Sequence, residues 1–209
     1  MDSSRPVRRR GKEIRERFLS AALLIPAAPV IAVAAVAIKL EGLVDRDARG
    51  PVFFSEQRVS RGRVIQLLKF RTLTKSALDS LGPGPTHIGV LERQRRLTRI
   101  GRFLKAWYLD ELPQLWNIVR GDMFLIGTRP YPLDLYEQEL ARGITRKRDM
   151  PAGLIGPVQA NKGTKGADGV DLDAQYWDMF RSASAWQMFR VDSRIVMRSL
   201  GVQLRHEGL

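Results

Sequence analysis

Residues 18–38 form an apolar run without any charged side chain, FLSAALLIPAAPVIAVAAVAI, and this run constrains the fold more than any other feature. About 20 apolar residues are enough to cross a bilayer as a straight helix, and the run just reaches that length. Pro26 and Pro29 lie in its middle, and an interior proline removes a backbone hydrogen bond at a cost of about 3 kcal/mol. We therefore predict a membrane-embedded helix that is kinked or broken at the two prolines.

Basic residues flank the apolar run on both sides. Arginine and lysine outnumber acidic residues within 1–17, and Lys39, Arg46 and Arg49 follow the run. Since positive flanks are retained in the cytoplasm, a single span with basic residues at both ends is unfavourable. A re-entrant helix, which bends at the prolines and leaves the membrane on the side it entered, keeps both flanks in the cytoplasm. The residues favour this form only slightly over a single span with a proline kink, which membrane helices tolerate.

The composition excludes several classes of site and leaves polyanionic partners open. The 209 residues carry a net charge of +13, which is typical of proteins that bind nucleic acid, anionic lipid or a phosphorylated substrate. The chain has no cysteine, so disulfides, thiolate metal sites and a cysteine nucleophile are excluded. Its two histidines, His87 and His206, lie far apart in the sequence, which argues against a zinc site built from histidine.

The remainder of the chain predicts a mainly helical α+β domain with one short hairpin. Strands are expected at 52–54 and 64–70, and Arg61 and Gly62 form the turn between them. Glycine and proline make 79–90 a loop, which contains His87. Helices are expected at 101–107, about 110–120, 131–142 and 173–200, and irregular structure at 149–169. The predicted organisation is a basic N-terminus (1–17), a membrane helix (18–40) and a globular domain (41–203).

The 173–200 region carries aromatic and methionine side chains among arginines, including Trp186, Phe189, Met197, Arg190 and Arg194. This mixture suits an amphipathic helix that lies in a membrane interface. It equally suits an ordinary helix that packs its apolar face into a protein core. Both interpretations stay open.

Asp110 and Glu111 are the acidic pair that most suggests chemistry. Pro113 is best tolerated in the first turn of a helix, so the two carboxylates are expected at the beginning of that helix. A capping aspartate with an acidic first turn is the simpler interpretation of this spacing. The functional interpretation makes one carboxylate a nucleophile and the other a metal ligand, as phosphoryl transfer often requires.

Basic residues near turns and glycines are candidates for binding a diphosphate, which requires several cations and backbone donors. The candidates are Lys69, Arg71, Lys105 and Arg129. Each of them, taken alone, would more often be a surface charge.

The order of motifs along the chain resembles the bacterial sugar transferases, the monotopic polyprenyl-phosphate phosphoglycosyl transferases. The resemblance rests on PVFF, QRV and RG within 51–62, then LKFRTL, LTRIGRFLKAWYLDELPQLWNIVRGDM, GTRP and PAGLIGPVQAN. It extends over nearly the whole chain, and its central block is long and specific. The chain is similar to the minimal, single-domain form of the family.

This resemblance implies an enzyme at the cytoplasmic face of the bacterial plasma membrane, with a re-entrant helix broken at a proline. Such enzymes transfer sugar-1-phosphate from a UDP-sugar to polyprenyl phosphate, release UMP and begin a surface glycan. The family's nucleophilic aspartate, which forms an aspartyl-phosphosugar, corresponds to Asp110, and its Mg²⁺-associated glutamate corresponds to Glu111. The basic residues of its motifs, which are expected to bind substrate phosphates, correspond to Lys69, Arg71, Lys105 and Arg129.

Departures from the family pattern bear on the substrate contacts. Thr128 replaces the first proline of the family's GPRP, and Lys105 replaces an arginine, which keeps the charge but loses the bidentate fork. The family's PGxTGWAQVNGR reads PAGLIGPVQANKG, so Gly163 aligns with the final arginine. Lys162 or Lys165 is expected to supply the missing cation.

Two alternatives come from other classes of protein. A membrane-tethered nucleic-acid-binding protein would explain the positive charge, but the sequence contains no helix-turn-helix, zinc-finger or stacking-platform signature. A catalytically inactive scaffold homologue is disfavoured because Asp110, Glu111 and Arg129 are present. The sequence does not define which sugar is used, which glycan is built or whether the chain forms a homodimer.

Overall fold

The computed structural model describes residues 9–80, 91, 94, 96–162 and 169–204. The predicted loop residue His87, together with Gly163 and Lys165 of the departing motif, lies outside these residues. The described part of the chain is mainly helical and contains a three-stranded and a two-stranded sheet. This confirms the predicted α+β class.

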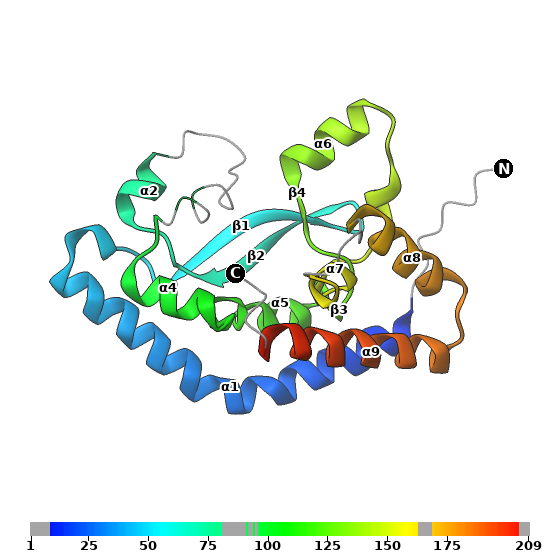
Figure 1. The fold of residues 1–209 in the computed structure, drawn as a ribbon, viewed down its shortest axis with the longest axis horizontal. Coiled ribbons are helices and arrows are strands. Elements are labelled where there is room, and N and C mark those ends of the chain that lie inside the picture. Colours follow the sequence, from blue (N-terminus) through cyan, green and yellow to red (C-terminus); the bar gives the residue numbers. More distant parts are fainter. Residues whose placement is uncertain (1–8, 81–90, 92–93, 95, 163–168, 205–209) are drawn as a thin grey trace.

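The elements keep the labels of Figure 1. The helices are α1 (Arg10–Val44), α2 (Lys75–Asp79), α4 (Arg99–Ala106), α5 (Gln114–Arg120), α6 (Leu133–Ala141), α7 (Pro157–Ala160), α8 (Gly169–Ser182) and α9 (Ala185–Leu204). The strands are β1 (Phe53–Ser60), β2 (Arg63–Phe70), β3 (Phe124–Ile126), β4 (Tyr131–Pro132) and β5 (Gly153–Ile155). Short 3-10 turns lie between them at η1 (Arg46–Ala48), η2 (Leu109–Glu111) and η3 (Arg146–Arg148).

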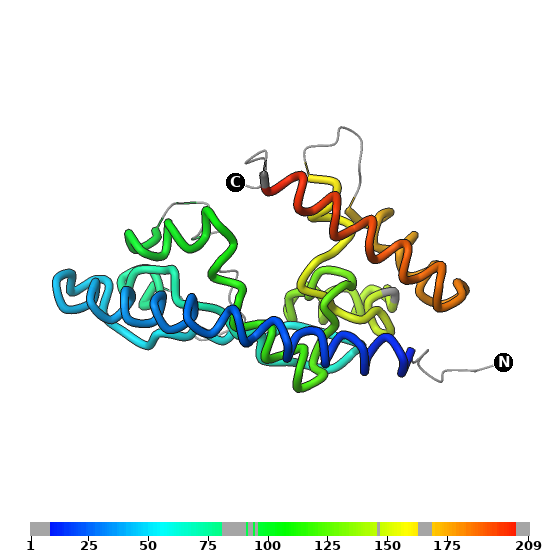
Figure 2. Tube along the Cα trace, turned by 90° about the horizontal axis from the view of Figure 1, so that it is seen from below, coloured from blue at the N-terminus to red at the C-terminus, as the bar shows by residue number. Residues whose placement is uncertain are grey.

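Helix α1 runs without interruption through the whole apolar segment, and Pro26 and Pro29 lie inside it. The prolines bend the helix rather than break it, and Figure 1 shows the bend near its middle. Among the described residues, α1 is the one helix long and apolar enough to cross a membrane, judged by length and composition. It extends past the predicted 18–40 at both ends, where charged residues of α1 bind the rest of the chain. Figure 2 shows α1 lying along the length of the molecule.

Strands β1 and β2 form the predicted hairpin and pair antiparallel from Phe53↔Phe70 to Ser60↔Arg63. Arg61 and Gly62 make its turn with φ values of 51° and 68°, and a type I′ turn requires positive φ at both central positions. The first strand is longer than predicted because cross-strand pairing continues over its whole length. Strand β4 pairs with the other edge of β1, so the strand order is β2-β1-β4.

The predicted helix over 131–142 is too long at its beginning. Tyr131 and Pro132 form β4, because Tyr131 pairs with Val59 of β1 before the helix starts. The region expected to be irregular, 149–169, contains β5, which pairs in parallel with β3, and the one-turn helix α7. These short elements are set by pairing with distant segments, which local sequence does not reveal.

The predicted helix over 173–200 is two helices, α8 and α9. Ser184 begins the second one with a reciprocal cap. Its Oγ accepts a hydrogen bond from the Gln187 N–H at 3.3 Å, and its own N–H donates to Gln187 Oε1 at 2.8 Å. Such a capping box satisfies donors at a helix start, so the chain begins a new helix here instead of extending the old one.

The main hydrophobic core lies where α5, β3, α8 and α9 meet the sheet. Its buried members include Ile65, Leu67, Leu115, Ile118, Phe124, Ile126, Tyr176, Phe180, Met188 and Ile195. Helix α9 presents two different faces, because Met188 and Ile195 are buried while Trp186 and Met197 are 65% and 70% exposed. One face therefore packs in the core as an ordinary helix would, and the exposed face has the apolar and basic composition of an interfacial helix.

The outer edge of β2 is covered by Asn117 of α5. Asn117 Oδ1 accepts from the Leu68 N–H at 2.9 Å, and its Nδ2 donates to the Gln66 carbonyl at 2.8 Å. A further bond from Nδ2 to Asp122 Oδ2 at 2.9 Å fixes the amide orientation. Since unpaired strand edges tend to pair with other chains, this side chain protects the sheet and holds α5 against it.

Candidate active site

Asp110 and Glu111 lie in the one-turn helix η2, immediately before α5. The helix predicted to begin near these residues starts slightly later, since Pro113 is the N-cap of α5 and α5 begins at Gln114, so the two carboxylates lie just before its first turn. Tyr108 precedes the turn in a left-handed conformation with φ of +56°, which is strained for a bulky side chain. Strain of this kind, about 1–3 kcal/mol, is found most often at functional sites and is held in place by the surrounding structure.

Asp110 is buried and faces a lysine from the preceding helix. Its Oδ2 lies 3.8 Å from Lys105 Nζ, and the Asp110 side chain is 3% exposed against 28% for Lys105. Lys105 is near the C-terminal end of α4, where a cation is also favoured by the helix dipole. The predicted nucleophile and one predicted cation are therefore neighbours.

Helix α4 is held in place from its first turn. Thr98 caps it through a hydrogen bond from the Gly101 N–H to Thr98 Oγ1 at 2.9 Å. The helix lies so close to the chain after β2 that a Cβ on Gly101 would overlap the backbone of Thr72. Glycine is thus required at this position if Lys105 is to stay where it is.

Arg129 follows β3 on a loop that is fixed by its neighbour Thr128. The Thr128 N–H and Oγ1 both donate to the Pro151 carbonyl, at 3.0 Å and 3.1 Å, and its carbonyl accepts from the Gly153 N–H at 2.7 Å. A proline at 128, as in the family's GPRP, has neither the N–H nor the hydroxyl. The threonine therefore adds donors that hold this loop to β5, and it leaves Arg129 exposed.

Lys162 lies close enough to Arg129, Lys105 and Glu111 for their charges to act on it. Lys162 is exposed, but partial desolvation of its amine lowers the pKa, the cations Arg129 and Lys105 lower it further, and Glu111 opposes them. Of the two lysines expected to supply the missing cation, Lys162 is thus the one that the described structure brings to this cluster. We call Lys105, Asp110, Glu111, Arg129 and Lys162 the charged cluster.

Tyr108 is a member of the same neighbourhood that the sequence analysis missed. Burial raises the pKa of its phenol, the carboxylates of Glu111 and Asp110 raise it further, and Lys105 and Arg129 oppose them. The phenol therefore stays protonated at neutral pH and lies beside the carboxylate pair. Nothing in the sequence marked Tyr108 as part of the site, since a tyrosine close before an acidic pair is an ordinary pattern.

Comparison with known proteins identifies the family. Residues 7–206 match the family described as bacterial sugar transferase. The chain belongs to the bacterial sugar transferase family. It is 34% identical over 207 residues to a UDP-glucose:undecaprenyl-phosphate glucose-1-phosphate transferase of Caulobacter vibrioides, covering 93% of this chain and 72% of that protein.

Two further relatives show how length varies in the family. The galactosyl transferase CpsE of Streptococcus agalactiae is 34% identical over 185 residues, which are 83% of this chain but 39% of that protein. The undecaprenyl-phosphate galactose phosphotransferase of Salmonella typhimurium is 30% identical over 177 residues, which are 79% of this chain and 36% of that protein. The chain thus spans little more than a third of these two relatives. The family assignment does not support the alternative of a nucleic-acid-binding protein.

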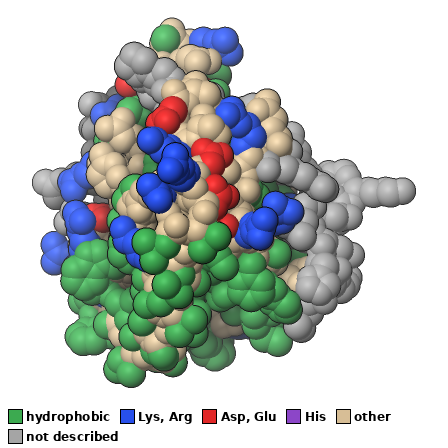
Figure 3. All heavy atoms as spheres, turned by 90° about the vertical axis from the view of Figure 1, so that its left-hand side faces the viewer, with side chains coloured by type: hydrophobic (Ala, Val, Ile, Leu, Met, Phe, Trp, Pro, Cys, Tyr) green, Lys and Arg blue, Asp and Glu red, His purple; other side chains and the backbone are tan. Residues whose placement is uncertain are grey.

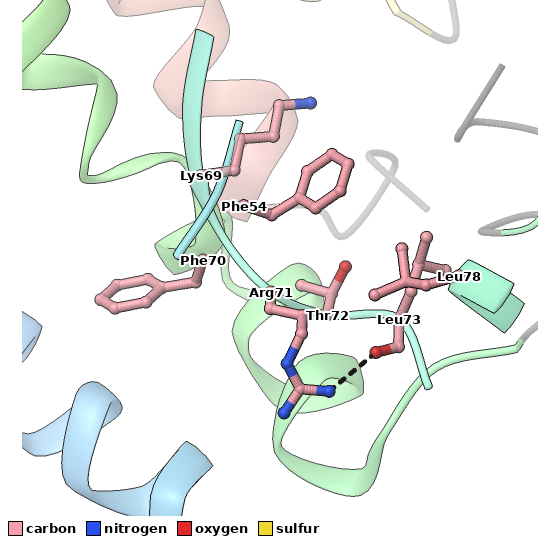
Figure 4. Close-up of a pocket in the computed structure, with 7 residues that line it drawn as sticks. All are labelled: Phe54, Lys69, Phe70, Arg71, Thr72, Leu73 and Leu78. Atoms are coloured by element: carbon pink, nitrogen blue, oxygen red, sulfur yellow. Dashed lines mark hydrogen bonds between the residues drawn. The ribbon is translucent and has the colours of Figure 1, made fainter. Parts of the chain in front are cut away.

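Lys69 pairs with a carboxylate of its own sheet. In this sugar transferase its Nζ is 3.6 Å from Glu56 Oε2 on the neighbouring strand, and Glu56 also accepts a hydrogen bond from Arg58. Figure 4 shows Lys69 beside Phe54 in a small pocket next to the end of β2. Its predicted contact with a substrate phosphate stays a prediction.

The position of Arg71 argues against its predicted contact with a substrate phosphate. The residue is 2% exposed, and Figure 4 shows its side chain extending away from Lys69. The guanidinium donates to the carbonyls of Pro51 at 2.9 Å, Leu73 at 3.1 Å and Ala48. A buried cation with its donors used in this way joins chain segments together, so Arg71 organises the loop between η1 and β1.

The carboxylates of the charged cluster fit Mg²⁺ only as a partial ligand set. Among the described residues, no group of three or more aspartate, glutamate, histidine or cysteine side chains is placed to hold a metal ion. Mg²⁺ in phosphoryl-transfer sites is commonly held by one or two carboxylates together with substrate phosphates. Asp110 and Glu111 match that pattern, with Glu111 the half-exposed one of the two.

Replacement of Lys162 tests whether it belongs to the phosphate-binding surface. We expect Lys162→Ala to weaken binding of UDP by about two- to fivefold, because an exposed charge contact is worth on the order of 1 kcal/mol or less. Lys162→Arg should retain the wild-type affinity, measured by calorimetry. Lys75→Ala, which removes an exposed lysine from α2, is the matched control. Equal losses in the Lys162→Ala and Lys75→Ala variants would assign the effect to net charge alone.

Proposed function

We propose that this sugar transferase moves sugar-1-phosphate from a UDP-sugar to polyprenyl phosphate and releases UMP. The observation that carries the proposal is the buried Asp110 carboxylate 3.8 Å from Lys105, inside a cluster of cations. A relative of 34% identity is named for the transfer of glucose-1-phosphate from UDP-glucose to undecaprenyl phosphate. The product of such a reaction, a polyprenyl-diphosphate sugar, would begin a surface glycan.

The reaction has two displacements at one phosphorus. In the first, a carboxylate oxygen of Asp110 attacks the β-phosphorus, and the bond from that phosphorus to the bridging oxygen breaks, so UMP leaves with the electron pair. In the second, a phosphate oxygen of polyprenyl phosphate attacks the same phosphorus, and Asp110 leaves as a carboxylate. A carboxylate and a phosphate both attack as anions, so neither step has to remove a proton from a hydroxyl or thiol.

The charged cluster lowers the cost of bringing anions together. Asp110 adds a negative charge to a site that must receive a diphosphate, and Lys105, Arg129 and Lys162 supply compensating charge. Glu111 would hold Mg²⁺, which when bound neutralises charge on the substrate phosphates. The phenol of Tyr108, which stays protonated, adds a hydrogen-bond donor close to these charges.

The lipid substrate requires the site to lie at a membrane surface, and the exposed apolar side chains support this. In Figure 3 hydrophobic side chains occupy the lower part of the molecule, beneath a band of basic and acidic ones. The exposed apolar residues on α1 include Phe18, Ile25, Val33, Leu43 and Val44. We propose that these residues lie in the cytoplasmic leaflet of the plasma membrane, with the charged cluster facing the cytoplasm.

The attachment of α1 at both ends supports the re-entrant form over a single span. Glu16, near the beginning of α1, accepts a hydrogen bond from Leu125 of β3, and Glu41, near its end, accepts one from Arg99 of α4. Both partners belong to the same globular body. A helix that crossed the membrane would place these two ends on opposite sides, which one body could not bind.

Mass spectrometry tests the covalent step. Incubation with a UDP-sugar and without polyprenyl phosphate should add one phosphosugar to the protein and release at most about one UMP per site. UDP-glucose and UDP-galactose are the first donors to test, because relatives carry these names. The added mass should map to the peptide with Asp110 and be absent from Asp110→Asn, while Glu111→Gln should slow its formation without moving it. An adduct on another residue would remove Asp110 from the mechanism.

Thiol labelling tests the re-entrant topology, since the chain has no cysteine of its own. Single cysteines at the exposed positions of Gly11→Cys and Lys75→Cys lie on the two sides of the apolar run. Both should be protected from a membrane-impermeant thiol reagent in intact cells and labelled after permeabilisation. Labelling of Gly11→Cys from outside, with Lys75→Cys protected, would establish a single span.

A further inference from the structure

The two ends of α1 bind the two segments that supply the charged cluster, and they do so through carboxylates. Glu41 accepts hydrogen bonds from the first turn of α4, the helix that leads to Lys105 and Asp110. Glu16 accepts them from β3, the strand that leads to Arg129. The apolar run and its bend lie between these two carboxylates.

Glu41 serves as an external cap for α4. Its Oε1 accepts from the Arg99 N–H at 2.6 Å, and its Oε2 accepts from the Ile100 N–H at 3.2 Å. The first N–H groups of a helix have no partner within the helix, and a carboxylate near them is further favoured by the helix dipole. Glu41 thus fixes where α4 begins relative to the end of α1.

Apolar packing extends the same contact toward the site. Ala34 and Ile38 of α1 are buried against Leu104 of α4, and Leu109 packs at the edge of this cluster. Leu109 is the residue before Asp110, so the apolar cluster that α1 shares with α4 reaches the turn that carries Asp110. The end of α1, α4 and η2 consequently form one packed unit.

Glu16 binds the other segment from a buried position. It is 2% exposed, and its Oε2 accepts from the Leu125 N–H at 2.9 Å and the Ile126 N–H at 3.4 Å. Lys12 Nζ compensates its charge at 2.6 Å and also contacts Asp192 of α9 at 2.5 Å. A buried carboxylate is tolerated only with such partners, which holds β3 in one position against α1.

We infer that α1 positions the active site: Glu16 and Glu41 are positioning residues that set the placement of Arg129 relative to Lys105 and Asp110. The bend at Pro26 and Pro29 lies between the two anchors, so the shape of the membrane helix defines the separation of the two halves of the site. The inference rests on the proposed function, because its readout is formation of the phosphosugar adduct. On this inference α1 both anchors the enzyme in the membrane and positions the groups of the active site.

Variants of Glu41 test the inference through the rate of adduct formation per active site. A rate constant from single-turnover mass spectrometry does not depend on how much protein is inactive, so partial misfolding would not imitate the effect. Glu41→Ala should slow adduct formation about tenfold or more at saturating UDP-sugar, because small displacements of catalytic groups are costly. Glu41→Gln keeps an acceptor for the Arg99 N–H and should remain within about threefold of wild type. Asp45→Ala is the matched control, since Asp45 caps η1 at the same end of α1.

Glu16 should affect a different parameter. Glu16→Gln keeps an acceptor for the Leu125 N–H but removes the charge that pairs with Lys12. Because its strand leads to Arg129, we expect an increase of about three- to tenfold in the UDP-sugar concentration that gives half the maximal rate. The Glu41 variants carry the test alone if Glu16→Gln does not fold.

Amide hydrogen exchange separates this inference from the covalent mechanism. Glu41→Ala should increase exchange at Arg99 and Ile100 whether or not an adduct forms. An unchanged rate of adduct formation in Glu41→Ala would overturn the inference, even if exchange at these two amides becomes faster. If the wild-type enzyme forms no adduct, the covalent mechanism fails instead. The rate of UMP release from UDP-sugar in the same variants then decides whether Glu41 positions the site.

Discussion

The attachment of both ends of one apolar helix to one globular body is the constraint on which the structure depends. At one end a buried network joins Lys12 and Glu16 to Asp192 of α9, and at the other Glu41 caps α4. Burial raises the pKa of Asp192, and Lys12 opposes that rise, so the network relies on this lysine for its charge balance. Both ends of this helix therefore lie on one globular body, which is the observation behind the proposed re-entrant form.

The same arrangement suits the covalent intermediate that we propose. The nucleotide sugar is soluble in water, whereas the polyprenyl chain is soluble in lipid, and a carboxylate at the interface can hold the phosphosugar between the two encounters. Asp110 lies in a short turn between α4, which packs on α1, and α5, which packs on the sheet through Asn117. The proposed nucleophile is thus held between the long apolar helix and the sheet.

Sequence alone predicted the features that depend on local chemistry. The apolar run, the Arg61–Gly62 turn and the acidic pair Asp110–Glu111 each have a short-range physical signature, and the structure contains the helix, the hairpin and a buried Asp110 beside Lys105. The roles expected for the acidic pair came from the resemblance of the motifs to a known family. Features set by distant contacts are not visible in the sequence, and the burial of Arg71 is one of them, because it depends on carbonyls from other segments. The strained Tyr108 and the capping role of Glu41 likewise become visible only after the chain has folded.

Isotope exchange tests the central claim most directly, because it reports the first displacement without requiring the lipid acceptor. The enzyme would be incubated with an unlabelled UDP-sugar that it turns over and with radiolabelled UMP, in the absence of polyprenyl phosphate. Reversal of the aspartyl-phosphosugar step should transfer the label into the UDP-sugar, and Asp110→Asn should show no exchange. Exchange that appears only after polyprenyl phosphate is added would contradict the account, since it would mean that both substrates must be bound before any bond to phosphorus breaks.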